Sequence, residues 1–278
     1  MYKILKKEEL SKNVFFMRVR APEIAESRKA GQFVIVQVAT EYGERVPLTI
    51  ADADADEGWI ELVIQAVGAT TIKICQKEVG DHLGSILGPL GNPSEIFKAK
   101  HVVAVAGGIG AAPLYPIVEA HKEFGNKVTV ISGARTKELV IFEDKMKAMA
   151  DDLILITDDG SYGRKGLVTE PLKELCESDD PPDLVIAIGP PIMMKFAALT
   201  TKPFGIHTIV SLNTIMIDGT GMCGGCRVEI GGETKFVCMD GPEFDAHKVD
   251  FDSMMSRMKA FKKREEKDKH KCNMGFHS

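Results

Sequence analysis

The middle of the chain alternates short apolar runs with stretches of helical periodicity, and this alternation restricts the fold more than any other feature. The apolar runs predict five strands, at 101–106, 127–132, 153–157, 183–188 and 207–212. The stretches between them predict helices near 111–124, 139–150, 167–178 and 191–200. Such alternation is typical of a parallel sheet with helices on both faces, in which ligands bind at the carboxyl ends of the strands. We therefore expect the loops at 107, 133, 158 and 189 to open onto one crevice.

Residues 1–95 show a different pattern, in which alternating or apolar runs are separated by turn residues. The runs lie at 14–19, 32–38, 46–50, 59–67 and 82–87. They predict a small antiparallel β-barrel. One helix is expected to interrupt this barrel, beginning at Thr70 or Thr71 and ending at Gly80.

Length, charge and cysteine content restrict the class of protein. A chain of 278 residues suits about two domains plus an appendage, and a formal net charge of −5 disfavours nucleic-acid binding. No stretch approaches the roughly 18 apolar residues of a membrane helix, and the N-terminus lacks the apolar core of a signal peptide, so we expect a cytoplasmic protein. Of the six cysteines, Cys75 and Cys176 lie among apolar helical residues and are expected to be small buried side chains.

Three other cysteines belong to a motif whose first part is a glycine-rich segment that begins at Asp218. This segment reads Asp-Gly-Thr-Gly-Met-Cys-Gly-Gly-Cys, and eleven residues separate it from Cys238. The spacing is that of a 2Fe-2S ligand set whose first cysteine is replaced by aspartate, which makes Asp218, Cys223, Cys226 and Cys238 the predicted ligands. A zinc knuckle on the three cysteines is the alternative, because C-x-x-C binds zinc as readily as iron. The four residues between Asp218 and Cys223 favour the cluster.

The end of the chain predicts a short hairpin and a helix. The hairpin strands are expected at 226–230 and 234–237, joined through two glycines. Residues 253–271 look helical, with Met254, Met255, Met258 and Phe261 on a face that we expect to dock on this chain or on a partner subunit. The expected units are thus a barrel at 1–95, an α/β domain at 96–212, a cluster module at 213–250 and a helical, charged tail at 251–278.

The predicted crevice has features of a dinucleotide site. Residues 106–113 form a glycine-rich turn between a strand and a helix, where bare backbone and a helix N-terminus can receive a pyrophosphate. Residues 133–135, 158–160 and 189–193 occupy the equivalent turns after three other strands. Asp158 and Asp159 would repel the extra phosphate of NADP and so favour NAD, whereas Arg135 and Lys137 would attract that phosphate and favour NADP.

The barrel half offers a second ligand site on one extended segment. Arg45 and Thr49 are four residues apart, which places both on the same face of a strand. A guanidinium suits a pair of phosphates, and a hydroxyl suits a flavin ring nitrogen. The next strand and the start of the predicted helix at residue 70 lie close by in the sequence.

In this order the segments resemble the ferredoxin reductase superfamily, in which a flavin-binding barrel precedes a nicotinamide-binding domain. The cluster loop narrows the resemblance to electron-transfer subunits of dihydroorotate dehydrogenase. The aspartate at the first ligand position and the segment 240–247 make it most similar to small subunits of NADH-dependent reduced ferredoxin:NADP oxidoreductases. The resemblance implies FAD, a 2Fe-2S cluster and NAD(H), with direct hydride exchange between nicotinamide and flavin and no catalytic side chain. It also implies a heterodimer with a larger, NADPH-oxidising flavoprotein subunit that carries FAD and 4Fe-4S clusters, and electron bifurcation between ferredoxin and NAD.

The resemblance further implies contact residues for both organic cofactors. The flavin contacts fall on two segments of the barrel half: Arg45, Pro47, Leu48, Thr49, Val63, Gln65, Gly68, Thr70 and Thr71. The nicotinamide contacts fall in the loops of the crevice: Gly107, Gly108, Ile109, Gly110, Gly133, Arg135, Asp158, Asp159, Gly189, Pro190 and Met193. Many relatives have a cysteine where this chain has Ile188, which concerns the rate and the positioning of the nicotinamide rather than the activity itself.

Two other functions fit parts of the sequence. The nearer one is the electron-transfer subunit of a dihydroorotate dehydrogenase, which orotate would reoxidise. The distant one is a non-catalytic nucleotide-binding regulator stabilised by zinc. A visible absorption spectrum separates the second from an electron carrier, because a zinc protein without flavin is colourless.

Overall fold

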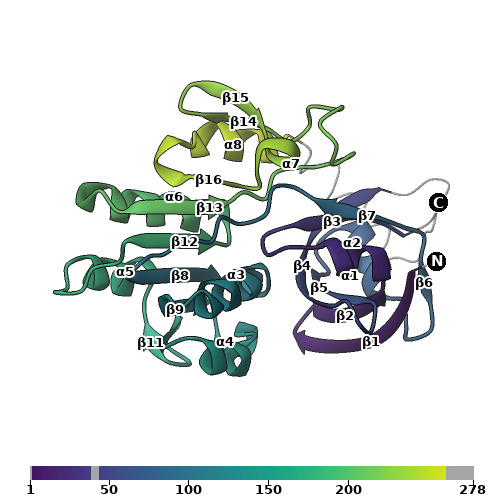
Figure 1. The fold of residues 1–278 in the computed structure, drawn as a ribbon, viewed down its shortest axis with the longest axis horizontal. Helices are drawn as coiled ribbons and strands as arrows, with labels where there is room; N and C mark the ends of the chain where they lie inside the picture. The colour runs from purple at the N-terminus through teal and green to yellow at the C-terminus, as the bar shows by residue number, and fades with distance from the viewer. Residues whose placement is uncertain (1, 39–43, 261–278) are drawn as a thin grey trace.

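The N-terminal barrel occupies one side of the molecule and an α/β domain the other, with a small C-terminal module above the seam between them (Figure 1). The computed structural model describes residues 2–38 and 44–260. The three parts follow one another along the chain in the predicted order. The predicted fold class is therefore confirmed.

The barrel is a single antiparallel sheet with the strand order β6-β1-β2-β5-β4-β3-β7. Its strands are β1 (Tyr2–Ser11), β2 (Val14–Arg20), β3 (Phe33–Gln37), β4 (Arg45–Asp54), β5 (Trp59–Gln65), β6 (His82–Leu83) and β7 (Ser85–Leu90). The short helices are α1 (Pro22–Ser27) and α2 (Ala69–Cys75). Alternate residues fill the barrel interior, among them Leu62 and Ile64 of β5.

The structure corrects three details of the predicted barrel. β1 was not predicted, because Ile4 is its only buried residue and charged residues mask the alternation. α1 was also missed, and α2 ends at Cys75 rather than at Gly80. The single run predicted at 82–87 is two strands, β6 and β7, which pair with different neighbours.

The α/β domain contains a second sheet with the order β11-β10-β9-β8-β12-β13-β16. Its strands are β8 (His101–Gly107), β9 (Lys127–Ala134), β10 (Asp152–Thr157), β11 (Arg164–Lys165), β12 (Leu184–Ile188), β13 (His207–Ser211) and β16 (Glu243–Asp245). All pairings are parallel except that of β16 with β13. Its α-helices are α3 (Ala111–Glu123), α4 (Glu143–Met149), α5 (Thr169–Cys176) and α6 (Pro191–Thr201).

The five predicted strands and four predicted helices of this domain are confirmed. α3 and α4 supply core residues on one face of the sheet, and α5 and α6 on the other. α4 begins later than predicted, because Phe142 adopts a left-handed conformation with φ of 62° just before it. The thiol of Cys176 is buried in this core and that of Cys75 in the barrel, and burial raises the pKa of both thiols to about 11.

The C-terminal module contains the hairpin β14 (Arg227–Ile230) and β15 (Glu233–Phe236), followed by α7 (Val237–Asp240) and α8 (Phe251–Met258). Between these two helices the chain returns to the sheet of the α/β domain, where β16 pairs with β13. The hairpin prediction is confirmed, although Val237 belongs to α7. Met254 is 1% exposed, and Met255 and Met258 pack against the same core, so this face docks on the chain itself. Phe261 and the rest of the predicted tail lie outside the described residues.

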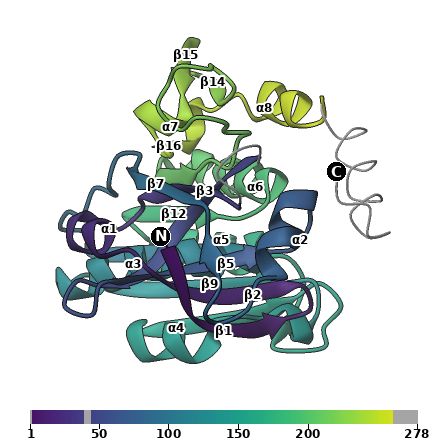
Figure 2. The same cartoon turned by 90° about the vertical axis from the view of Figure 1, so that its right-hand side faces the viewer.

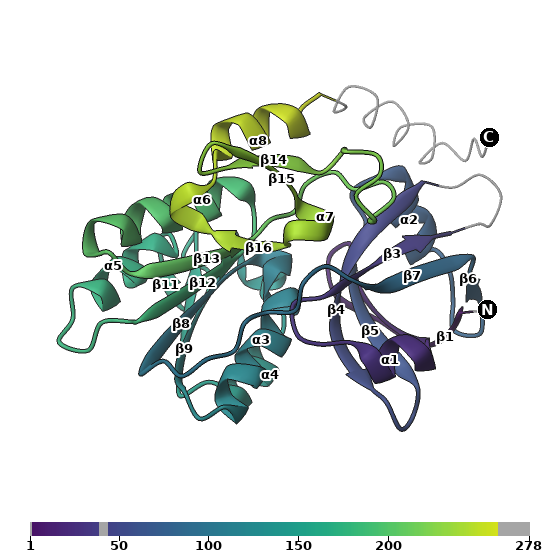
Figure 3. The same ribbon diagram turned by 45° about the horizontal axis from the view of Figure 1, so that its top comes forward.

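Two apolar cores cross the boundaries between the parts. One core combines Phe16, Ala51 and Val63 of the barrel with α3 and its neighbours. The other combines Phe33 and Ile35 of β3 with the C-terminal module and α6. Turned views show the module at the top of the molecule, with α7 over the seam (Figures 2 and 3). Among the described residues, no helix is both long enough and apolar enough to span a membrane.

Candidate functional site

The four predicted cluster ligands form two close pairs. The Cys223 Sγ lies 3.4 Å from the Asp218 Oδ1, and the Cys226 Sγ lies 3.3 Å from the Cys238 Sγ. Cys223 is exposed, whereas Cys226 and Cys238 are buried. Around one tetrahedral metal ion, a thiolate and a carboxylate oxygen are roughly 3.5 Å apart and two thiolates roughly 3.8 Å apart, so both pairs are close to the spacing of ligands that share an ion.

Backbone amides hold the Asp218 carboxylate in place. It accepts hydrogen bonds from the Cys223 amide at 2.8 Å and from the Thr220 amide at 3.1 Å. Partial burial opposes ionisation, but these amides outweigh it and hold the pKa of Asp218 below its ordinary value. Burial raises the pKa of Cys238 to about 12, with a further contribution from the neighbouring thiol of Cys226.

The two pairs do not merge into a single mononuclear site. In the described ranges 2–38 and 44–260, no three side chains of His, Cys, Asp or Glu gather closely enough to hold one metal ion. A zinc knuckle needs three or four ligands around one point. A 2Fe-2S cluster needs two protein ligands at each iron, which is the arrangement of two separate pairs.

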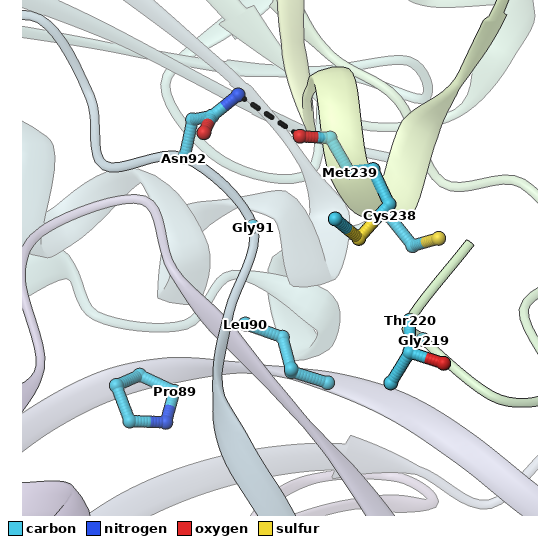
Figure 4. Close-up of a pocket in the computed structure, with 8 residues that line it drawn as sticks. All are labelled: Pro89, Leu90, Gly91, Asn92, Gly219, Thr220, Cys238 and Met239. Carbon is cyan, nitrogen blue, oxygen red and sulfur yellow. Dashed lines mark hydrogen bonds between the residues drawn. The ribbon is translucent and has the colours of Figure 1, made fainter.

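The cluster loop is pressed against the barrel. A Cβ atom on Gly219 would lie 2.7 Å from the Ile35 Cγ1 and 2.8 Å from the Leu90 Cδ1, and its φ of +75° also favours glycine. A cavity of about 330 Å³ borders this contact. It lies between the end of β7, the loop at Gly219 and Thr220, and Cys238 and Met239 of α7 (Figure 4). Asn92 donates a hydrogen bond to the Met239 carbonyl at 3.2 Å across its rim.

The glycine loops of the α/β domain meet where the strand order reverses, between β8 and β12. Gly107 and Gly189 approach so closely that a Cβ atom on Gly189 would lie 3.0 Å from the Gly107 Cα, and one on Gly107 would lie 2.5 Å from the Met193 Sδ. A Cβ atom on Gly110 would lie 2.2 Å from the Ile188 carbonyl oxygen. Gly108 differs, because it has φ of +55° and open space around it. Ligands bind at this kind of switch point, and Gly108 leaves room for one.

The other predicted nicotinamide residues lie further along the sheet edge. Gly133 is the penultimate residue of β9, and a Cβ atom there would lie 2.2 Å from the Val168 Cγ1, so packing accounts for this glycine. Asp158 and Asp159 follow β10, two strands from β8. The Asp159 carboxylate accepts hydrogen bonds from the Ser161 hydroxyl at 2.7 Å and the Ser161 amide at 2.9 Å, and these lower its pKa. Arg135, Asp158 and Asp159 are exposed.

The predicted flavin residues divide between the two faces of β4. Val46 and Leu48 pack against the barrel interior. Arg45, Pro47 and Thr49 alternate with them and therefore lie on the outer face, as predicted for Arg45 and Thr49. A ligand on the outer face can therefore contact only the backbone of Leu48.

The second predicted flavin segment joins β5 to α2. Val63 lies on the outer face of β5 in the core shared with α3. The Thr71 hydroxyl accepts hydrogen bonds from the Gly68 amide at 3.0 Å and the Val67 amide at 3.1 Å, so it caps the helix. The Thr70 hydroxyl donates to the Glu44 carboxylate at 2.5 Å, which ties α2 to the beginning of β4.

One polar group near these loops was not predicted from the sequence. Thr214 follows β13 at the same edge of the sheet, and its hydroxyl is buried without a hydrogen-bond partner. A buried unpaired hydroxyl is uncommon in folded proteins. Its only sequence signal is its place just after a strand, which does not separate it from ordinary loop threonines.

Comparison with known proteins matches each of two parts of the site to a known family. The family of the iron-sulfur cluster binding domain of dihydroorotate dehydrogenase B matches residues 213–250, and the oxidoreductase NAD-binding domain matches residues 104–198. A homologue of the dihydroorotate dehydrogenase B electron transfer subunit from Thermotoga maritima is 45% identical over 94% of this chain and 92% of its own length. A protein from Clostridium beijerinckii, described as uncharacterized, is 50% identical over 96% of this chain and 93% of its own.

A solved structure agrees with these matches. A chain from the NADH-dependent reduced ferredoxin-NADP oxidoreductase superposes with a TM-score of 0.93 and 42% sequence identity, covering 99% of this chain and 98% of that one. The predicted resemblance is therefore confirmed. The chain belongs to the family of dihydroorotate dehydrogenase B electron-transfer subunits and their homologues, ferredoxin-reductase-like oxidoreductases that use FAD, NAD(H) and a 2Fe-2S cluster.

Proposed function

We propose that this chain exchanges electrons between NAD(H) and a partner protein, and that Asp218, Cys223, Cys226 and Cys238 hold its 2Fe-2S cluster. The observation that supports this most directly is the arrangement of the four side chains as two pairs, at 3.4 Å and 3.3 Å. Two pairs suit two irons and do not suit one zinc ion. The zinc-stabilised regulator is therefore disfavoured.

The proposed roles of the chain's residues follow from where they lie. The outer face of β4 presents Arg45 and Thr49 to a flavin, and the open backbone at Gly108 admits the pyrophosphate of NAD(H). When bound, FAD supplies the chemistry that links two-electron hydride exchange with one-electron transfer to the cluster. No side chain is required as a general acid or base.

Thr214 is a further candidate for contact with a cofactor. Its buried hydroxyl has no partner, which costs about 1–3 kcal/mol unless a ligand or water completes the hydrogen bond. It lies at the same sheet edge as the loops at 107–110 and 189–193. We include it in the proposed site.

The proposed partner is a larger flavoprotein subunit. The similar Thermotoga maritima protein is named as a homologue of an electron transfer subunit, and such a subunit works with another protein. The solved relative comes from an electron-bifurcating ferredoxin-NADP oxidoreductase that depends on NADH. By that similarity we propose a heterodimer whose larger subunit carries FAD and 4Fe-4S clusters and oxidises NADPH, with ferredoxin as the other electron carrier.

A dihydroorotate dehydrogenase partner is the second candidate, because the cluster-domain family and the Thermotoga maritima relative carry that name. Purification of the chain from its native cell, together with whatever protein accompanies it, separates the two. We expect a flavin spectrum with a red-brown shoulder, two irons from this chain in addition to those of the partner's 4Fe-4S clusters, bleaching by NADH, and reoxidation by NADP in the presence of reduced ferredoxin. Reoxidation by orotate would instead establish the second candidate, and a colourless zinc protein would contradict both.

A further inference from the structure

Charged side chains join the barrel to the α/β domain at the edge of their shared apolar core. Glu61 of β5 is 2% exposed and accepts a hydrogen bond from the Arg18 guanidinium, with 2.7 Å between Nη2 and Oε1. Its other oxygen, Oε2, accepts a hydrogen bond at 3.3 Å from the ammonium of Lys145 in α4. Arg18 and Glu61 both belong to the barrel, whereas Lys145 belongs to the other domain. We name the contact between Glu61 and Lys145 the interdomain ion pair.

Lys145 is held from several sides. Its ammonium lies 3.6 Å from the Oδ2 of Asp52 on β4, so two carboxylates of the barrel attract it. It also lies 5.0 Å from the ring centroid of Tyr115 and 4.9 Å from that of Phe142, which belong to its own domain. These contacts orient the lysine, whose side chain is 38% exposed, toward the barrel, so that it links α3 and α4 to β4 and β5.

The ion pair lies on the elements that carry the proposed cofactor contacts. Glu61, Val63 and Gln65 share one face of β5, and Glu61 is about 13 Å along the strand from Gln65. α3 begins at Ala111, directly after the loop 107–110, and contributes Tyr115 to the lysine site. The ion pair therefore lies between the helix that continues this loop and the strand that carries proposed flavin contacts, where it can bear on the separation between the loop and the flavin face of the barrel.

This separation matters for hydride exchange. The reaction needs its reacting atoms about 3–3.5 Å apart, and a displacement of about 1 Å costs roughly 10²-fold in rate. We propose that Glu61 and Lys145 are positioning residues that fix the nicotinamide loop relative to the flavin strand. The proposal rests on the proposed function of the site.

The test uses the full-length holoprotein and four variants. Lys145→Met removes the charge but keeps the length of the side chain, and Lys145→Arg keeps the charge. Lys147→Met is the matched control, because Lys147 is exposed on the same helix. The fourth variant combines Glu61→Gln with Lys145→Met and so removes both charges of the interdomain ion pair. Flavin and iron contents that equal those of the wild type show that each variant has folded.

Single-turnover reduction by NADH and amide hydrogen exchange supply the two measurements. In Lys145→Met we expect flavin reduction about tenfold slower, with the Kd for NADH changed less than about twofold. Lys145→Arg should return to within about twofold of the wild type, and the double variant should be no slower than Lys145→Met. Amides of α3 from Tyr115 to Glu119 should exchange faster in Lys145→Met than in Lys147→Met.

Several outcomes would overturn the ion pair as a positioning device. One is a Lys145→Met protein that reduces its flavin as fast as the Lys147→Met control. Another is an arginine variant as slow as the methionine variant, which would mean that the charge is irrelevant. A wild-type protein that NADH does not reduce would instead defeat the proposed function, and the exchange measurement would then decide the ion pair alone.

Discussion

The cluster loop and the loop 107–110 are both rich in glycine, yet their glycines have different structural roles. Gly219 lets the cluster loop lie against Ile35 and Leu90 of the barrel, which brings a predicted ligand next to the flavin domain. Gly107 and Gly110 let the turn after β8 pack closely against the end of β12 and the residues that follow it, and of the three glycines in the loop 107–110 only Gly108 has open space around it. A glycine-rich turn is therefore weak support for a nucleotide site by itself, whereas side chains at ligand spacing carry specific chemistry.

The largest effect should come from removing one predicted ligand. We expect Cys238→Ser to reduce the iron content from about two per chain to nearly none, because the second iron loses half of its protein ligands. Iron and sulfide analysis with the visible spectrum measures this. Cys75→Ala is the control and should retain the iron, since this thiol is buried in the barrel core. Full retention of iron in Cys238→Ser would remove this residue from the ligand set.

The next effect separates the two kinds of glycine in the loop 107–110. Gly110→Ala should lower the free energy of unfolding by about 2–4 kcal/mol, because its Cβ atom would overlap the Ile188 carbonyl oxygen. Gly108→Ala should cost about 1–2 kcal/mol for its left-handed backbone. Chemical denaturation measures both values.

Gly110→Ala should have the larger effect on stability, whereas Gly108→Ala should have the larger effect on NADH binding. Gly108→Ala should weaken NADH binding by about tenfold, because a methyl group there enters the space left for the pyrophosphate. A titration of flavin reduction against NADH concentration measures it. Unchanged NADH affinity in this variant would show that the open space at Gly108 is not used.

A smaller effect concerns the aspartate in the cluster loop. A carboxylate is a harder ligand than a thiolate and favours ferric iron, so we expect Asp218→Cys to keep the cluster and to raise its midpoint potential. A shift of about 60 mV corresponds to a tenfold change in the one-electron equilibrium. Redox titration followed by electron paramagnetic resonance measures it, and an unchanged potential would exclude a tuning role for Asp218.

The smallest effect should come from the exposed charges after β10. Asp158→Asn should improve the use of NADPH relative to NADH by about two- to fivefold, since exposed charge interactions contribute about 0.2–1 kcal/mol. Asp158 suits this test better than Asp159, whose carboxylate is engaged by Ser161. The ratio of kcat/KM for the two nucleotides measures the preference. No change would place Asp158 away from the adenosine end.

The sequence was most informative where regular patterns coincide with burial. All seven residues of β8 are buried, so its apolar run was recognisable as a strand. β1 could not be recognised as a strand from the sequence, because only one of its ten residues is buried. In the predicted site, alternation placed Arg45 and Thr49 on one face of β4 and Leu48 on the other, but it could not show which of the two faces is the barrel interior.

The local order of residues determined the succession of barrel, parallel sheet and cluster loop, because periodicity and ligand spacing depend only on near neighbours along the chain. Tertiary structure decided which distant groups meet. Neither Lys145 nor Glu61 carries a signal for its partner, since 84 positions separate them. Their contact exists because α3 packs on β4 and brings α4 against the barrel, and long-range packing of this kind depends on the whole fold.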